Sequence, residues 1–119
     1  MDGGALIKTE DFFLLMRGWR DSKASLRVKF LSSALQLSVF CTVLDAREGR
    51  VAFWIGEEKY NSATDFNVTG CFFGFRDVTA DEAAGLPVGM EPESAIEAVR
   101  DDFALLIMLL KCDDLLEET

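Results

Sequence analysis

Residues 103–110 read FALLIMLL, eight consecutive apolar side chains between the acidic pair Asp101-Asp102 and a polar sequence that begins at Lys111. At the helical repeat of about 100° per residue, one side of a helix would carry Ile96, Val99, Phe103, Ile107 and Leu110, with Leu106 at its edge. Pro92 suits the first position of such a helix, because an N–H there would have no partner in any case. The pattern predicts a C-terminal helix that packs on the rest of the protein.

A second apolar stripe follows the opposite side of this predicted helix. Its members recur at helical spacings: Leu105, Met108, Leu109, Cys112 and Leu116. Burial of its four larger side chains would contribute about 6–12 kcal/mol before the costs of association. A small domain has little with which to cover two stripes, so we expect a homodimer that forms through these residues. The alternative is that Phe13 and Leu14 of a first helix cover the second stripe within one chain.

A membrane role does not suit the apolar run. A helical span needs about 20 apolar residues, whereas this run has eight and lies close to Arg100, Asp101, Asp102 and Lys111. An interfacial helix would carry Lys and Arg on its polar face, and this one carries acids. The sequence therefore favours a protein partner over a lipid surface.

The first part of the chain predicts one helix, over residues 9–20. Apolar side chains recur there at i, i+3, i+4 and i+7: Phe12, Leu15, Met16 and Trp19. Thr9 is available as the N-cap, and two acids follow it in the first turn. Gly18 is expected near the end of this helix or beneath a crossing strand.

From Ser25 onward, apolar and polar residues alternate, as in strands with one covered face. The alternation predicts strands over residues 26–30, 35–43 and 51–55, a short strand over 60–63, and a longer strand over 66–75. Gly70 is expected to bend the last of these. Gly49 suits the left-handed position of a hairpin turn.

After these strands, Thr79 and Glu82 match a capping box at the start of a short helix. Together the elements predict a single α+β domain over residues 1–119, with residues 1–8 and 113–119 frayed. It would comprise an N-terminal helix, an antiparallel meander of four or five strands and a C-terminal helix packed on the sheet. Phe40, Leu44 and Trp54 should point away from the covered face, so that the second face also needs cover. Curling into a partial barrel, a helix or a partner would provide it.

The composition narrows the classes of function. A net charge of −9 repels nucleic acid, and the early basic residues are expected to be solvent-facing charges: Lys8, Arg17, Arg20, Lys23, Arg27 and Lys29. The chain has no histidine, which removes the commonest general base and histidine-containing metal sites. Three cysteines without close spacing and no signal peptide suit the cytoplasm. We expect neither a cofactor nor a metal site.

The leading prediction is a non-enzymatic binding or assembly module that self-associates through its C-terminal helix. The alternative is a small-molecule binding domain, weakly catalytic at one end of a curved sheet, with candidate ligand residues Trp54, Tyr60, Asn67 and Arg76. Arg76 would hold an organic anion there, beside Asp77. A cavity shared by Trp54 and Arg76 would favour ligand binding, whereas a flat apolar patch with Leu105 and Leu109 would favour association.

Overall fold

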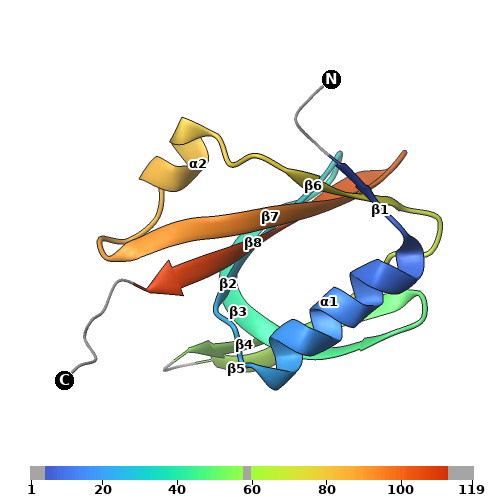
Figure 1. Ribbon diagram of the computed structural model, residues 1–119, viewed down its shortest axis with the longest axis horizontal. Coiled ribbons are helices and arrows are strands. Elements are labelled where there is room, and N and C mark those ends of the chain that lie inside the picture. Colours follow the sequence, from blue (N-terminus) through green and yellow to red (C-terminus); the bar gives the residue numbers. More distant parts are fainter. Residues whose placement is uncertain (1–4, 58–59, 113–119) are drawn as a thin grey trace.

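The computed structural model describes residues 5–57 and 60–112, which form one antiparallel sheet of eight strands and two helices (Figure 1). The strands lie in the order β1-β6-β7-β8-β2-β3-β4-β5. In chain order the elements are β1 (Ala5–Ile7), α1 (Thr9–Asp21), β2 (Leu26–Ser32), β3 (Gln36–Arg47), β4 (Arg50–Glu57), β5 (Tyr60–Asn67), β6 (Phe72–Arg76), α2 (Ala80–Ala84), β7 (Met90–Arg100) and β8 (Phe103–Cys112).

The predicted C-terminal helix is wrong, and so is the predicted meander of four or five strands. Residues 90–112 form the hairpin β7-β8, in which Arg100 pairs with Phe103 around the two-residue turn Asp101-Asp102. Hairpins of this length usually need a positive φ in the turn, which favours glycine. Neither aspartate has a positive φ, so this turn does not require glycine. The sequence therefore lacks the glycine that usually marks a short hairpin.

The run FALLIMLL is apolar because β8 is a central strand that is covered on both faces. Phe103, Leu105 and Ile107 belong to the main core, and the latter two are 0% exposed. The alternate residues point to the other face, where Met108 is 1% and Leu110 is 6% exposed. A continuous apolar run of this length fits a buried strand as well as a buried helix, so helical spacing within it carried no information.

The sheet curls around α1, and the chain connectivity requires this. Six strand spacings separate β5 from β6, which in a flat sheet would be about 29 Å. Only residues 68–71 connect the two strands, and a link of that length spans at most about 18 Å. The two halves of the sheet must therefore approach each other, as Figure 1 shows. We call the face toward α1 the inner face and the opposite one the outer face.

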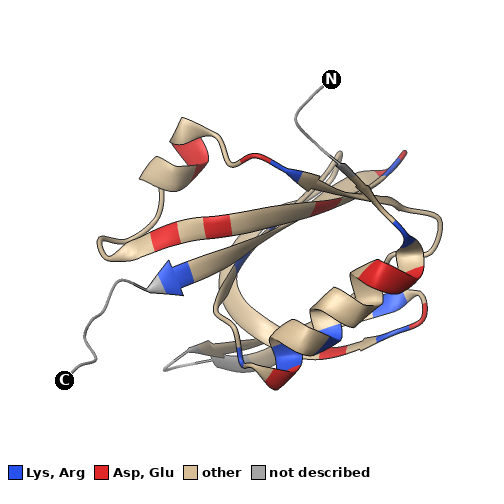
Figure 2. Ribbon diagram, viewed as in Figure 1, with Lys and Arg blue, Asp and Glu red and all other residues tan. Residues whose placement is uncertain are grey.

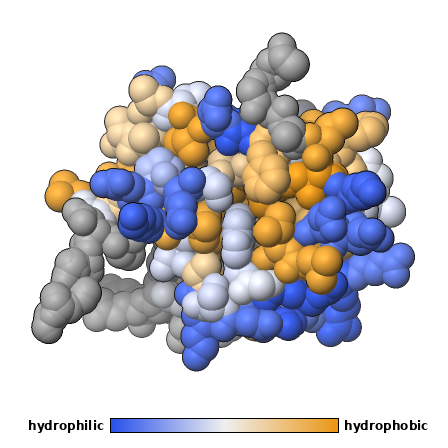
Figure 3. All heavy atoms as spheres, viewed as in Figure 1, coloured by the Kyte–Doolittle hydropathy of each residue, from blue (hydrophilic) through white to orange (hydrophobic). Residues whose placement is uncertain are grey.

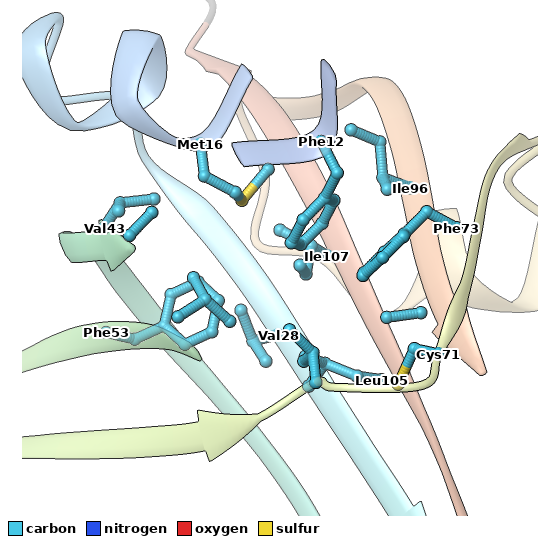
Figure 4. Packing of buried hydrophobic residues seen from close by; sticks show 14 of the residues in the cluster. Phe12, Met16, Val28, Val43, Phe53, Cys71, Phe73, Ile96, Leu105 and Ile107 are labelled. Carbon is cyan, nitrogen blue, oxygen red and sulfur yellow. The ribbon is translucent and has the colours of Figure 1, made fainter. Parts of the chain in front are cut away.

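The main core fills the inner face and is closed by α1 (Figure 4). Phe12 of α1 is 0% exposed and stacks on Phe73 of β6, with ring centroids 4.1 Å apart. On the other side Phe30 of β2 stacks on Phe66 of β5 at 5.0 Å, which joins strands that are not neighbours in the sheet. Aromatic contacts between opposite parts of the curl thus hold it closed.

Arg100 links the turn of β7-β8 to the connection between β5 and β6. Its Nη1 donates to the carbonyl of Thr69 at 2.7 Å, and its Nε and Nη2 donate to the carboxylate of Asp102 at 2.7 and 3.1 Å. The guanidinium also lies 4.5 Å from the ring centroid of Phe103. These hydrogen bonds from Arg100 lower the pKa of Asp102 below its ordinary value.

Several local predictions are confirmed and two are corrected. Residues 9–20 do form a helix, and the Thr79–Glu82 capping box is present at α2. However, Lys8 rather than Thr9 is the N-cap of α1, and no side chain caps it. The predicted strand over 66–75 is two strands, because Gly70, at a φ of +83°, lies in the link between β5 and β6 rather than in a bulge.

Replacing Gly49 by alanine is expected to lower the free energy of unfolding by about 2–3 kcal/mol. Gly49 has a φ of +80°, and a Cβ on it would lie 2.8 Å from Oγ1 of Thr69. Its carbonyl also accepts a hydrogen bond of 2.8 Å from the amide of Val68. Urea unfolding of Gly49→Ala measures the loss.

Gly89→Ala is the matched control, because Gly89 has a φ of +90° with nothing within 4 Å of its added Cβ. It should show only the conformational cost, about 1 kcal/mol. The double variant Gly49→Ala/Thr69→Ala should recover part of the loss. Equal losses for Gly49→Ala and Gly89→Ala would contradict the predicted clash with Thr69.

Candidate functional site

A cavity of about 340 Å³ opens beside Trp54 and is lined by residues of five strands, β2, β3, β4, β7 and β8, and by Ser25, which precedes β2. Its lining residues are Ser25, Leu26, Phe40, Cys41, Thr42, Trp54, Gly56, Met90 and Leu110. Trp54 and Phe40 remain 38% and 37% exposed. Large aromatic side chains that stay open beside a cavity are typical of sites that bind another molecule. We call this feature the Trp54 cavity.

Strand pairing explains why these side chains gather on the outer face. Thr42 of β3 pairs with Trp54 of β4, and Phe40, two residues earlier, points to the same face. A bulge between Val43 and Asp45 interrupts the ladder, and Leu44 at this bulge is 46% exposed. The prediction that Phe40, Leu44 and Trp54 point away from the core is therefore confirmed.

A positive charge lies over the ring of Phe40, which lines the Trp54 cavity, although Arg27 itself is not one of the lining residues. The guanidinium of Arg27 is 4.6 Å from the ring centroid of Phe40, and its Nε donates to Oγ of Ser38 at 2.8 Å. Arg27 pairs with Phe40 on one side and with Met108 on the other. In the described part of the chain, neither Arg27 nor Lys29, the next residue on that face, forms an ion pair with a carboxylate.

Arg76 lies elsewhere and is already occupied. Its Nη2 and Nη1 donate to the carboxylate of Glu82 at 2.8 and 3.3 Å, and Glu97 lies 3.6 Å from its Nε. Glu97 belongs to β7, a strand along which several acidic residues lie (Figure 2). Arg76 lines two other cavities, of about 460 and 160 Å³, and Trp54 lines neither. The guanidinium is neutralised by its own chain, which disfavours the capture of an organic anion.

The structure does not bring the four predicted ligand residues together. Trp54 lines one cavity and Arg76 lines others. Asn67 ends β5, where its Oδ1 accepts a hydrogen bond of 3.0 Å from the amide of Thr69. Tyr60 begins β5, and its side chain lies outside the described part of the protein. The signal that identifies the Trp54 cavity is instead the outward position of Phe40 and Trp54, together with Arg27, which sequence reasoning took for an ordinary surface charge.

The residues predicted for self-association do not form one surface either. Leu105 and Leu109 pack with the inner core, whereas Met108 points to the outer face and is 1% exposed. Cys112 is the last residue of β8, and Leu116 lies outside the described residues. The helix face that grouped them does not exist, because β8 sends alternate residues to opposite faces.

Another cavity, of about 550 Å³, lies at the start of α1. It is lined by Thr9, Glu10, Phe13, Leu14, Arg17 and Glu48. Hydrophobic side chains reach the surface in this part of the molecule, over β1 and α1 (Figure 3). However, Arg17 already donates to the carbonyl of Ala46 at 3.1 Å, and Phe13 is only 5% exposed. This cavity therefore offers less to a ligand than the Trp54 cavity.

Cys41, the one thiol that lines the Trp54 cavity, is poorly suited to act as a nucleophile. Burial raises the pKa of Cys41 to about 12, so its thiol stays protonated at neutral pH and is a poor nucleophile. Within residues 5–57 and 60–112, no three metal-ligating side chains lie together in a possible metal site. Neither described helix is long and apolar enough to cross a membrane.

The cavity thus combines exposed aromatic rings with aliphatic walls, and over its Phe40 ring lies the guanidinium of Arg27, which pairs with no described carboxylate. Any proposal about its function therefore rests on these chemical features and not on a related protein. The chain matches no protein-family model, no curated protein and no solved structure.

Proposed function

We propose that the protein is a non-enzymatic binding module whose Trp54 cavity accepts an acidic, leucine-containing segment of another protein. The observation that carries this proposal is the open pair of rings, Phe40 and Trp54, beside an arginine that no described carboxylate neutralises. Trp and Arg are among the residues that contribute most to binding at protein interfaces.

The walls of the cavity fit aliphatic side chains. Phe40, Trp54, Met90 and Leu110 supply apolar surface, and Gly56 adds no side chain of its own. Each medium aliphatic side chain that leaves water on such walls contributes roughly 1.5–3 kcal/mol. Leucine side chains of a partner would therefore supply the larger share of the affinity.

Arg27 adds selectivity for acids. Its guanidinium is held in place by the ring of Phe40 and by Ser38, so little conformational freedom is lost when it pairs with a carboxylate. Hydrogen bonds between arginine and carboxylate are about twice as strong as neutral ones. Because the chain carries a net charge of −9, the attraction of an acidic segment would depend on this local positive charge.

The test uses a fluorescein-labelled peptide of sequence EDLLDE in a titration followed by fluorescence anisotropy. The peptides EDSSDE and KRLLRK, which lack the leucines or the acids, serve as comparison probes. The full chain should prefer EDLLDE to both. Trp54→Ala should weaken binding by about 30-fold, because hot-spot residues contribute about 2 kcal/mol or more. Arg27→Gln should weaken it about tenfold and reduce its salt dependence.

Two controls separate binding from folding. Leu14 is 60% exposed on α1 and does not line the cavity, so Leu14→Ala should bind as the wild type does. The circular dichroism of Trp54→Ala should match that of the wild type. Equal affinity for all three peptides, or an unchanged affinity in Trp54→Ala, would exclude the proposed function.

A further inference from the structure

We infer that β5 is a self-association edge, along which two copies of the chain pair antiparallel about a twofold axis and join their sheets. The described strands form an open sheet whose two ends are β1 and β5. Within residues 5–57 and 60–112, β5 pairs with no strand other than β4. The inference is independent of the proposed function, because it concerns the edge of the sheet and not the Trp54 cavity. It keeps the homodimer expected from the sequence but forms it through a strand edge instead of a helix face.

The ladder between β4 and β5 shows which backbone groups would bind a second strand. One step beyond the end of this ladder, the amide of Val68 donates to the carbonyl of Gly49 at 2.8 Å. Residues of an antiparallel strand alternate between bonding to one neighbour and facing the other. Even-numbered residues of β5 therefore bond to β4. Odd-numbered residues, among them Ala63 and Asp65, direct their N–H and C=O groups away from it.

β5 lacks the features by which proteins usually protect an edge, namely a short length, bulges, prolines and lysines. Its eight residues pair with β4 without a shift of register, and residues 60–67 contain neither proline nor lysine. The opposite edge, β1, has only three residues. Ser62, Ala63 and Asp65 are exposed. The edge of β5 is therefore the one that offers a long, open row of backbone groups.

The sequence of β5 suits a second copy of itself. An axis at Ala63 would place Ala63 opposite its counterpart and Asp65 opposite Asn61 of the other copy, because the paired strands run in opposite directions. Asp65 is the one charged residue of β5, and it already pairs with Arg50 at 3.1 Å. The two Asp65 residues would lie about 14 Å apart, beyond the screening length of about 8 Å at physiological salt. No like charges would therefore oppose each other.

Apolar surface would continue across this contact. Trp54 lies opposite Ala63 in the β4-β5 ladder, so the joined outer faces would carry two adjacent alanines with a tryptophan on each side. Trp54 is 38% exposed, and neighbouring strands lie only about 4.8 Å apart. Each ring can therefore reach over the small side chains at the axis, and contacts of this kind between strands stabilise a sheet.

The first test measures the oligomeric state of the full chain by sedimentation velocity. A short edge with about six backbone hydrogen bonds predicts a weak dimer, with a Kd of roughly 10–100 µM. Ala63→Lys and Ala63→Glu should each raise this Kd about tenfold or more, because like charges would then face each other across the axis. An equimolar mixture of the two variants should form a heterodimer with a Kd no higher than that of the wild type, because opposite charges would then face each other.

Ala34→Lys is the matched control, because it makes the same change at an exposed alanine outside the strands. It should dimerise as the wild type does. The circular dichroism of all three variants should match that of the wild type.

Hydrogen exchange of the wild type locates the contact without any substitution. Well above the Kd, the amides of Ala63 and Asp65 should exchange about tenfold more slowly than well below it, because exchange then requires dissociation. The amides of β1 should exchange at the same rate at both concentrations.

Three results would each overturn the inference: a wild type that stays monomeric up to about 1 mM, a dimer whose Ala63 and Asp65 amides gain no protection, or charged variants that form no heterodimer when mixed. Binding of the EDLLDE probe decides the proposed function separately. A monomeric wild type that binds the probe removes the inference alone, and a dimer that binds no probe removes the proposed function alone.

Discussion

Phe12→Ala is expected to remove about 3–5 kcal/mol from the free energy of unfolding. Phe12 is 0% exposed, stacks on Phe73 and contacts Phe13 edge to face at 5.2 Å. It is the side chain through which α1 closes the inner face over β6, so its removal leaves a cavity where helix and sheet meet. For a domain of ordinary stability, about 5–15 kcal/mol, this is a large fraction of the total. Urea unfolding followed by circular dichroism measures it.

Leu14→Ala is the control for Phe12→Ala, because it shortens an apolar side chain on the same helix that is 60% exposed. Its effect should stay within about 0.5 kcal/mol. A loss below about 1 kcal/mol in Phe12→Ala would show that α1 does not close the core, and the fold described above would be wrong at that point.

Ile107→Lys should be at least as destabilising, with an expected loss of more than about 4 kcal/mol. Ile107 is 0% exposed, and in the sheet it lies between Val28 and Ile96, which are also 0% exposed. A lysine there would place an ammonium group among aliphatic side chains without a partner. The measurement is again urea unfolding, with thermal unfolding as a second observable.

The neighbouring substitution Leu106→Lys should cost at most about 1 kcal/mol. Leu106 is half-buried on the outer face and lines a cavity with Glu82 and Glu97, whose carboxylates can accept the ammonium group. The contrast tests the strand directly. In a helix, residues 106 and 107 would border the same apolar stripe, so similar losses for the two variants would contradict the β7-β8 hairpin.

The local elements of the first half of the chain could be predicted from the sequence. The helix over 9–20, the strands that contain Leu26, Val39 and Phe53, and the left-handed Gly49 all follow from a single periodicity or a single turn signal. Each of these elements has one covered face, so its apolar residues repeat with a period that belongs to one type of structure only. Phe13, which lies beside the predicted stripe of α1, is buried as well.

The second half could not be predicted, for two physical reasons. First, β8 is buried on both faces and is composed largely of leucine and other good helix formers, so that tertiary context overrides propensity. Second, the turns that define this half have weak signals. Asp101-Asp102 makes its turn without glycine, and the short link around Gly70 joins distant parts of the sheet.

The candidate site was partly predictable. Trp54 was singled out, and the outward position of Phe40 follows from the alternation along β3. No pattern in the sequence identified Arg27 as a candidate site residue. Its guanidinium lies over the Phe40 ring only because β2 pairs with β3. Met90 and Leu110 reach the cavity only through the β7-β8 hairpin. The incorrect C-terminal helix therefore concealed two of the nine lining residues of the cavity.

The most direct test of the account is a titration of the ¹⁵N-labelled full chain with unlabelled EDLLDE peptide, followed by NMR. We expect the indole N–H signal of Trp54 and the Nε–H signal of Arg27 to shift together along one binding curve. The indole signal of Trp19 and the Nε–H signal of Arg76, which lie away from the cavity, should stay in place. Shifts centred on Arg76 and Glu82, or no shift at Trp54 at saturating peptide, would contradict the assignment of the Trp54 cavity as the binding site.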